Sequence, residues 1–334
     1  MWNDYWCFLM SLIDGNTRTL IHERFELFNS NTKRYFCGKY LHAWLDECFS
    51  FLVFGASPDD YYRYQFFKKS FSERNQFITF LRSKRIIRKY NDSSFFPMMN
   101  DKRLLNAFLE PFLGREWLDL SKVDDDAFHA FLAKYGRIIM KPYGGSGGKG
   151  IFIVDISETG SSQIRVSDYR DYIAEELLHQ HPDLERLNPS SVNTLRVMTF
   201  QGEIISATLK VGQHGAVVDN MCSNGLYGNI DLETGITDSY FMDIGLSLYE
   251  RHPETQEKLI GISIPNWSMV QDTVKQAAQL LEKVQYVGWD VAVLKDRVAI
   301  IEANEAPGHD LSIQSSKQQG LYQKIKTIEQ LHQR

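Results

Sequence analysis

The sequence predicts an α+β protein in which a helical N-terminal region precedes a larger part made of antiparallel hairpins and helices. Up to about Asn91, aromatic and long side chains recur at steps of three and four residues and Pro and Gly are scarce, which is typical of amphipathic helices. Beyond that point, short β-branched runs bounded by glycines lie between helix-like stretches. Because the strands occur as hairpin pairs without a regular βαβ alternation, the pattern favours α+β architecture.

The larger part contains six predicted strands and two well-marked predicted helices. The strands are expected at residues 137–140, 150–156, 194–200, 203–210, 287–294 and 298–303. The helices are expected at residues 124–135 and 268–284, and the second has a clear apolar face. We therefore expect three regions: a helical region (1–95), a subdomain with a glycine-rich loop (96–173) and a C-terminal subdomain (174–334).

Composition limits the possible functions. The 334 residues, 43% of them hydrophobic, suffice for one large domain or two modest ones. The net charge of -5 argues against a nucleic-acid binder, because such domains are usually basic. The apolar stretch from Trp2 to Ile13 is interrupted by Asp4 and lacks a basic lead-in, so we expect neither a signal peptide nor a membrane span. The cysteines lack metal-ligand spacing and indicate reduced thiols in a cytoplasmic protein: Cys7, Cys37, Cys48 and Cys222.

The glycine-rich run at residues 141–150 is the densest chemical signal. It contains a literal G-x-G-x-x-G, but the dinucleotide fingerprint requires a following helix, and a strand-like segment, 151–156, follows here. A Walker A loop is excluded as well, because Tyr143 stands at its first glycine position and Gly150 stands where Ser or Thr would be needed.

What remains is a strand, a flexible glycine loop and a second strand. The five glycines leave backbone N–H groups free to fold over phosphate oxygens, and Lys141 would add a positive charge. The alternative is a plain hairpin tip. A plain tip seldom needs five glycines flanked by two lysines, so we expect phosphate binding.

A second signal lies in the last predicted hairpin. Glu302 and Asn304 are two residues apart on a strand, so their side chains share a face. If a three-residue turn joins the strands, Asp290 lies directly opposite Glu302. Two neighbouring carboxylates repel, and Mg²⁺, which takes carboxylate, water and phosphate oxygens, would relieve that repulsion. The alternative is an exposed strand face with ordinary polar residues, but the alternate positions are uniformly apolar.

These motifs, in this order, resemble the ATP-grasp superfamily over about residues 95–315. Through Ala-Glu-Glu-Leu-Leu-His-Gln-His-Pro at 174–182 and Ser-Val-Asn-Thr-Leu-Arg-Val at 191–197, the chain is similar to the sugar-transfer-associated, glutathione synthetase-like branch. The resemblance implies two α+β subdomains that clasp ATP. Many members begin with a Rossmann-like domain, whereas the first ninety-odd residues here are predicted to be helical.

The resemblance also implies roles for particular residues. Nucleotide contacts would come from two phosphate lysines, a phosphate-covering flap and an interdomain hinge: Lys102, Lys141, Gly144, Gly145, Ser146, Gly147, Gly148, Lys149, Gly150, Glu175, Glu176, Leu177 and Leu178. The magnesium ligands would be Asp290, Glu302 and Asn304. Catalytic roles near the transferred phosphate and the acceptor would fall to Arg196, Lys210 and Asn220. An unpaired cation such as Arg196 in mid-strand is costly, which favours a functional role.

By this resemblance the chain would be an ATP- and Mg²⁺-dependent carboxylate–amine ligase that works through an acyl phosphate. Its partners would be ATP, an amine and a small-molecule or sugar-linked carboxylate in the biosynthesis or modification of surface polysaccharide. Nucleic acid is not expected. Two alternatives stay open: a small-molecule kinase that uses the same site, and a nucleotide-binding module without catalysis.

Overall fold

The computed structural model describes residues 33, 40–145, 150–157, 164–213, 225–309, 314 and 317–332. The chain divides into two compact units, residues 1–83 and 84–334. None of the helices in these described ranges combines the length and the apolar character that a membrane span requires.

The first unit is helical in its described part, as predicted. Its helices are α3 (Tyr40–Phe54), α4 (Pro58–Arg63), the 3₁₀ turn η1 (Phe66–Lys68) and α5 (Phe71–Arg74), and α6 (Phe80–Tyr90) begins in it. The aromatic residues whose spacing predicts these helices also form the core of this unit. Tyr64 and Phe77 have ring centroids 4.8 Å apart, Phe66 and Phe77 5.5 Å apart, and all three rings are fully buried.

The inner side of α3 is polar. Asp46 accepts hydrogen bonds from Arg74 Nη1 (2.7 Å) and from the Tyr61 hydroxyl (2.6 Å). Glu47 lies beside it, and its Oε2 is buried without a hydrogen-bond partner among the described residues. Burial, with a smaller contribution from Asp59, raises the pKa of Glu47 to about 7. Glu47 is thus an ionisable group that titrates near neutral pH.

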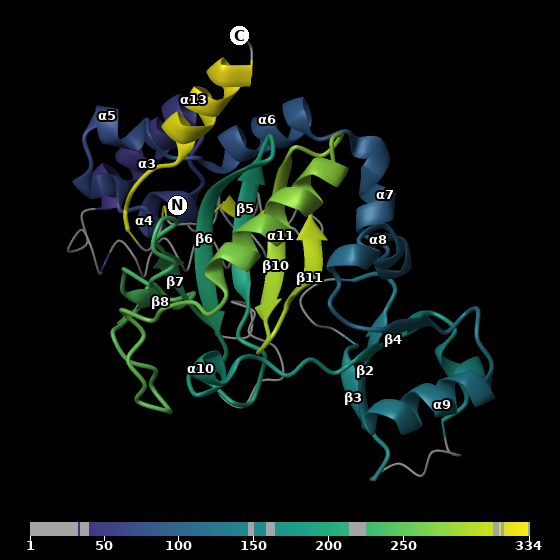
Figure 1. Ribbon diagram of the computed structural model, residues 1–334. Coiled ribbons are helices and arrows are strands. Elements are labelled where there is room, and N and C mark those ends of the chain that lie inside the picture. The colour runs from purple at the N-terminus through teal and green to yellow at the C-terminus, as the bar shows by residue number, and fades with distance from the viewer. Residues whose placement is uncertain are drawn as a thin grey trace, which may run out of the picture. The chain divides into compact units, whose positions relative to one another are not determined.

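The second unit contains a four-stranded antiparallel sheet in the order β1-β4-β2-β3 (Figure 1). The strands are β1 (Trp117–Asp119), β2 (Arg137–Pro142), β3 (Phe152–Asp155) and β4 (Tyr172–Glu176). Helix α9 (Asp125–Tyr135) begins at the N-cap Asp124 and ends at Gly136, whose φ of 69° suits glycine. Its buried residues Phe128 and Leu132 pack on Ile138 and Met140 of β2.

A seven-stranded antiparallel sheet, in the order β11-β10-β5-β6-β7-β8-β9, forms the rest of this unit. The strands are β5 (Leu195–Phe200), β6 (Glu203–Val211), β7 (Leu226–Ile230), β8 (Phe241–Met242), β9 (Leu248–Tyr249), β10 (Tyr286–Val293) and β11 (Val298–Asn304). Helix α11 (Trp267–Leu280) lies across β6, β5 and β10 (Figure 1). The strand residues that face α11 form the main core, with Leu195, Val197, Trp289 and Val291 fully buried.

The remaining elements connect these layers. They are η2 (Ser93–Phe95), α7 (Phe96–Met99), α8 (Lys102–Phe108), η3 (Glu110–Phe112), η5 (Val166–Tyr169), α10 (Pro182–Glu185) and α13 (Tyr322–His332).

All six predicted strands are present with ends shifted by a few residues. The predicted helix at 268–284 is too long, because α11 ends at Leu280 and the chain turns at Leu281. Lys283 O then accepts a hydrogen bond from Asp92 N (2.8 Å), and Val284 pairs with Asn91. Contacts with a distant segment therefore end the helix before its apolar pattern ends.

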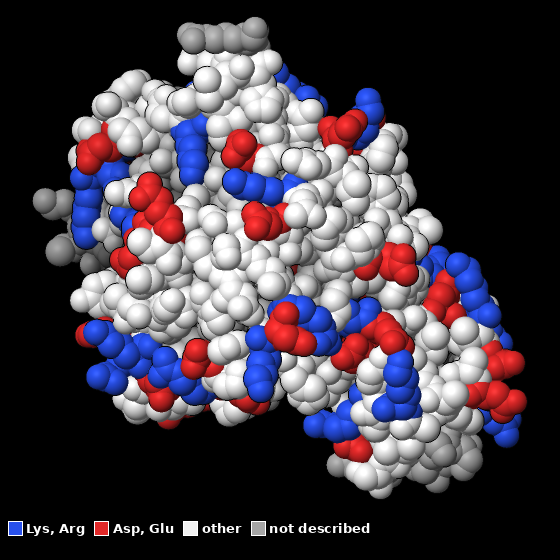
Figure 2. Space-filling model, viewed as in Figure 1, with Lys and Arg blue, Asp and Glu red and all other residues white. Residues whose placement is uncertain are grey.

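Acidic and basic side chains are interspersed on the face of the described surface that Figure 2 shows, without an extended patch of one sign.

Glu47→Gln should change how stability depends on pH. Because the folded pKa of Glu47 lies above its ordinary value, its contribution to stability is fully present at low pH and is lost as pH rises through about 7. Thermal midpoints measured from pH 5 to pH 8 should therefore fall less steeply in the variant. Glu73→Gln is the control, because hydrogen bonds from Ser70 lower the pKa of Glu73 and it stays ionised over this range. Parallel curves for wild type and Glu47→Gln would contradict the assignment.

Candidate active site

A straight row of polar residues crosses five neighbouring strands of the large sheet. In register order, Asn229 on β7 opposes Thr208, Thr208 opposes Arg196, Arg196 opposes Asp290, and Asp290 opposes Glu302 on β11. Residues directly opposite each other in antiparallel strands project from the same face. The row therefore lies on the face away from α11, while the alternate positions fill the core.

The predicted pairing of Asp290 with Glu302 is confirmed, but the predicted three-residue turn is wrong. Leu294 N donates to Arg297 O (2.9 Å), which closes a turn of only two residues. That turn alone would place Glu302 one position out of register. A β-bulge between the two parts of the hairpin leaves Ile301 without a partner on β10 and restores the pairing.

Asp290 is held between two cations. Arg196 Nε lies 2.8 Å from Asp290 Oδ1 as an ion pair without hydrogen-bond alignment, and Arg196 Nη2 donates to Oδ2 (3.2 Å). Lys210 Nζ lies 3.3 Å from Oδ1. Burial raises the pKa of Asp290, but the charges of Arg196 and Lys210 outweigh it and lower the pKa below its usual value. Asp290 is therefore ionised.

Gly288 makes room for this arrangement. A Cβ atom at Gly288 would lie 2.9 Å from Arg196 Nη1 and 2.9 Å from Pro307 Cβ. No side chain fits there unless the guanidinium moves. The Gly288-Trp-Asp290 sequence thus supplies both the carboxylate and the space for its arginine partner.

Glu302 and Asn304 supply oxygens that other described residues leave free. Neither a hydrogen bond nor an ion pair joins the Glu302 carboxylate to another residue in the described ranges, and burial together with Asp290 raises the pKa of Glu302. Asn304 donates from Nδ2 to Gly288 O (3.3 Å), which leaves its Oδ1 as an acceptor. An accumulation of acceptors without enough counter-charge fits a divalent cation.

This donor set fits Mg²⁺ better than a softer metal. No group of three or more His, Cys, Asp or Glu suited to a metal occurs in the described part of the chain, so a ligand set here must include the amide of Asn304. Glu302 and Asn304 fit directly. Asp290 would bind a metal only by sharing its oxygens with Arg196 and Lys210.

Lys141 reaches this region from β2 of the smaller sheet. Its Nζ lies 2.6 Å from Glu175 Oε2, and Glu175 Oε1 accepts hydrogen bonds from Arg115 Nη2 (2.8 Å) and Asn106 Nδ2 (2.8 Å). All four side chains are buried. Burial raises the pKa of Glu175, but Arg115 and Lys141 outweigh it and hold the pKa far below its usual value. One carboxylate thus holds two buried cations.

Lys102 lies at the start of α8. Its backbone N–H donates to Tyr143 O (2.9 Å) and its Nζ donates to Gly145 O (3.1 Å), so it contacts the beginning of the glycine loop. Arg103 lies 3.7 Å from the centroid of the Tyr143 ring. These contacts hold the first residues of the loop against α8.

Two lysines expected to bind phosphate and two of the three expected metal ligands line one pocket, whereas Asp290 is not among its lining residues. A cavity of about 200 Å³ is bordered by Lys102, Lys141, Gly145, Glu175, Glu302 and Asn304, together with Met99, Asn100, Leu105, Asn106 and Ile301. Eight residues of this lining come from segments that are far apart in sequence from Glu302. The two sets were identified separately in the sequence, and the fold brings them together.

The expected hinge, residues 175–178, begins with the last two residues of β4. Glu176 Oε1 accepts a hydrogen bond from Arg297 Nη2 (3.1 Å), and Leu178 packs against Ala292 and Leu294. Glu175 itself lies within β4, opposite Ile139 of β2. The carboxylate of Glu175 therefore belongs to the lysine site, whereas Glu176 and Leu178 contact the β10–β11 hairpin.

Several expected residues lie outside the described ranges: Ser146, Gly147, Gly148, Lys149 and Asn220. Gly144, Gly145 and Gly150 are described, and Gly145 and Gly150 have φ values of 104° and 75°. Sequence reasoning missed Asn106 and Arg115, which hold Glu175. No local motif marks them, and only a rule that a buried carboxylate needs cationic partners could have prompted a search.

A family model described as "Sugar-transfer associated ATP-grasp" matches residues 81–330. Among solved structures, the chain is similar to the ATP-grasp ligase PsnB complexed with minimal precursor (17% identity, TM-score 0.46, 78% of this chain and 71% of that chain). PsnB complexed with a phosphomimetic variant of the minimal precursor, Mg and ADP is similar as well (15% identity, TM-score 0.45, 72% of this chain and 61% of that chain). A third similar structure is D-alanine–D-alanine ligase from Bacillus anthracis (14% identity, TM-score 0.38, 70% of this chain and 63% of that chain). The chain thus spans less than two thirds of two of these three structures. No curated protein matches.

Glu175→Gln should destabilise the protein strongly, because it leaves the buried cations of Arg115 and Lys141 without a counter-charge. The expected loss is roughly 3–5 kcal/mol in urea unfolding. Glu116→Gln is the matched control, because Glu116 forms an exposed ion pair with Lys134 (2.6 Å). The control should cost little, because an ion pair exposed to solvent contributes little to stability. Equal losses of unfolding free energy in both variants would show that the buried cluster contributes no more to stability than the exposed ion pair.

Proposed function

The chain belongs to the sugar-transfer associated ATP-grasp family, and on this basis we propose that it is an ATP- and Mg²⁺-dependent ligase that joins a carboxylate to an amine. The fold expected from the sequence, an α+β ATP-grasp fold preceded by a helical region, is confirmed. The observation that supports the proposal most is the single pocket in which Lys102 and Lys141 meet Glu302 and Asn304.

The pocket suits a nucleotide triphosphate with its metal. Lys102 and Lys141 would bind the phosphates. The ion pair with Glu175 holds the Lys141 ammonium in place, and both residues line the pocket. Glu302, Asn304 and Asp290 would hold Mg²⁺, which would neutralise phosphate charge when bound. The backbone of residues 175–178 would contact the adenine edge, and residues 144–150 would cover the phosphates, as the family resemblance implies.

The proposed reaction has two steps. A carboxylate oxygen of the first substrate attacks the γ-phosphorus of ATP, the bond from that phosphorus to the β-γ bridging oxygen breaks, and ADP leaves. The amine then attacks the carbon of the acyl phosphate, an amide bond forms, and inorganic phosphate leaves as the amine loses a proton. Only the first step needs ATP, and it must occur away from water because an acyl phosphate hydrolyses readily.

Arg196 would act on the transferred phosphoryl group. Its guanidinium lies on the polar face in the same row as Asp290 and Glu302, so it adjoins the proposed metal site. The pairing with Asp290 fixes its orientation before substrate binds. Removal of one preorganised contact of this kind typically raises a barrier by roughly 3–4 kcal/mol. Lys210 adds a second charge beside it, and Asn220 is proposed for the acceptor side from the resemblance.

The family description points to a substrate linked to sugar transfer. We propose a uronic acid or an amino-acid group on a surface polysaccharide precursor as the carboxylate, which rests on that description alone.

The metal assignment predicts separable effects on activity and folding. Glu302→Gln should abolish ATP consumption, because an amide ligand replaces an anionic one. It should leave the fold intact and should not lower the thermal midpoint at neutral pH, because burial and the neighbouring Asp290 raise the pKa of Glu302 and so disfavour its ionised form in the fold. ADP release during a Mg²⁺ titration and circular dichroism measure the two effects, and Glu233→Gln, at an exposed turn, is the control. ATP consumption at the wild-type rate in Glu302→Gln would place the metal elsewhere.

Hydroxylamine distinguishes the ligase from a kinase. It traps an acyl phosphate as a hydroxamate but leaves most phosphate esters intact. With ATP, Mg²⁺ and a pool of carboxylates, we expect ADP and a hydroxamate, and both should be lost in Lys141→Ala. A phosphorylated acceptor that persists in hydroxylamine would establish the kinase alternative. Formation of AMP and pyrophosphate would exclude both.

A further inference from the structure

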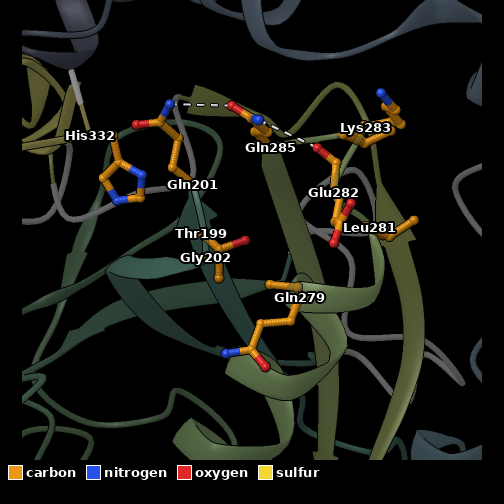
Figure 3. Close-up of a pocket in the computed structure, with 11 residues that line it drawn as sticks. Thr199, Gln201, Gly202, Gln279, Leu281, Glu282, Lys283, Gln285 and His332 are labelled. Atoms are coloured by element: carbon orange, nitrogen blue, oxygen red, sulfur yellow. Dashed lines mark hydrogen bonds between the residues drawn. The ribbon is translucent and has the colours of Figure 1, made fainter. Parts of the chain in front are cut away.

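A second cavity opens on another part of this unit. Its volume is about 510 Å³, within the range of small-molecule sites, roughly 300–1,000 Å³. It lies between the turn that joins β5 to β6, the C-terminal end of α11 and the C-terminal end of α13. Among the side chains that border it are Thr199, Gln201, Gln279, Glu282, Gln285 and His332 (Figure 3). None of its lining residues borders the pocket that contains Lys141.

The cavity belongs to the opposite face of the large sheet from the polar row. Thr199 opposes Val287, and Val287 is a member of the main core beneath α11. Leu281 and Val284, also in this core, form an apolar part of the cavity wall. A ligand here would therefore be separated from the nucleotide pocket by the sheet.

Gln201 has two unfavourable features at this cavity. Its φ of 50° is left-handed, a conformation that is unfavourable for a residue that carries a side chain. Its Oε1 is buried without a hydrogen-bond partner among the described residues. Gln201 and Gly202 form the two-residue turn between β5 and β6, where Asn-Gly or Gly-Gly would be the favoured choice. Strain and an unmet acceptor at the same residue point to a function for its side chain.

A chain of amides holds Gln201 in place. Gln201 N donates to Gln285 O (2.8 Å), Gln201 Nε2 donates to Gln285 Oε1 (3.3 Å), and Gln285 Nε2 donates to Glu282 O (3.4 Å). Because Gln201 Nε2 is engaged, its Oε1 is left as the acceptor. Figure 3 shows this pair along one edge, with Gln279 at the opposite edge and His332 to one side.

The lining is polar, and the charges of Glu282 and Lys283 within it are opposite in sign. Three primary amides and a hydroxyl offer hydrogen bonds without net charge, and the carboxylate of Glu282 is the nearest anion. Lys283 extends away from the other side chains in Figure 3, so it offers little to an anionic ligand. An ionised ligand would lose hydration without gaining a counter-charge, whereas a neutral ligand rich in hydroxyl groups would satisfy the amides.

We propose that this cavity binds a neutral saccharide unit. Planar amides of Gln201, Gln279 and Gln285 would share hydrogen bonds with adjacent hydroxyl groups, and the wall formed by Leu281 and Val284 would contact the C–H face of the sugar ring. The site is independent of the ligase reaction and uses none of its residues.

Direct binding of maltose and N-acetylglucosamine, measured by saturation-transfer NMR and calorimetry on the full chain, tests this proposal. We expect saturable binding that ATP with Mg²⁺ does not compete away. Gln201→Gly and Gln279→Ala should each weaken it by about tenfold, the effect of one good hydrogen bond to a buried group. Gln201→Gly suits the left-handed turn, so it should fold normally by its thermal midpoint.

The controls separate this site from the nucleotide pocket. Gln276→Ala, an exposed glutamine on α11 outside the cavity, should bind as wild type does. Lys141→Ala should also bind normally. The proposal is overturned by absence of saturable binding, by equal binding in Gln201→Gly and wild type, by competition with ATP, or by tighter binding of glucuronate than of the neutral sugars. None of these outcomes bears on the hydroxylamine experiment, so the proposed ligase function stands or falls separately.

Discussion

The ion pair between Arg196 and Asp290 is the interaction on which the rest of the site depends. Both residues lie in the middle of central strands, where a single charge without a partner would be costly. Together with Lys210 they keep Asp290 ionised and keep the guanidinium fixed against the sheet. Gly288 supports the pair by leaving room for the guanidinium. A polar row can therefore cross a sheet whose other face is a continuous hydrophobic core.

The same principle governs the smaller sheet. Glu175 neutralises both Lys141 and Arg115, and it also accepts a hydrogen bond from Asn106, so that each buried cation has a counter-charge. Arg115 extends this network, because its Nη1 donates to Ile300 O (2.7 Å) next to the bulge in β11. The lysine expected to contact phosphate and the strand expected to hold metal are thus linked by one arginine. Both sides of the pocket are positioned before a nucleotide binds.

The large sheet has different uses for its two faces. One face presents the charged row and the 200 Å³ pocket. The other face packs against α11, and at its edge, where α11 ends early at Leu280, the 510 Å³ cavity opens. Residues 281–285, which follow the end of α11, form part of the wall of this second opening. A charged site and an almost neutral site can coexist in one unit because the core separates them.

The sequence by itself determined what depends on local periodicity. It predicted six strands (β2, β3, β5, β6, β10 and β11), the helical character of the first region and the shared face of Glu302 and Asn304, because alternation and turn chemistry act over a few residues, but it missed β1, β4, β7, β8 and β9. Tertiary structure decided the rest. The bulge at Ile301 replaced a longer turn in setting the register, Asn91 and Asp92 ended α11, and Arg115 met Glu175 across 60 residues of sequence. Such contacts leave no local pattern, because a buried carboxylate requires a cation but does not specify where in the chain that cation lies.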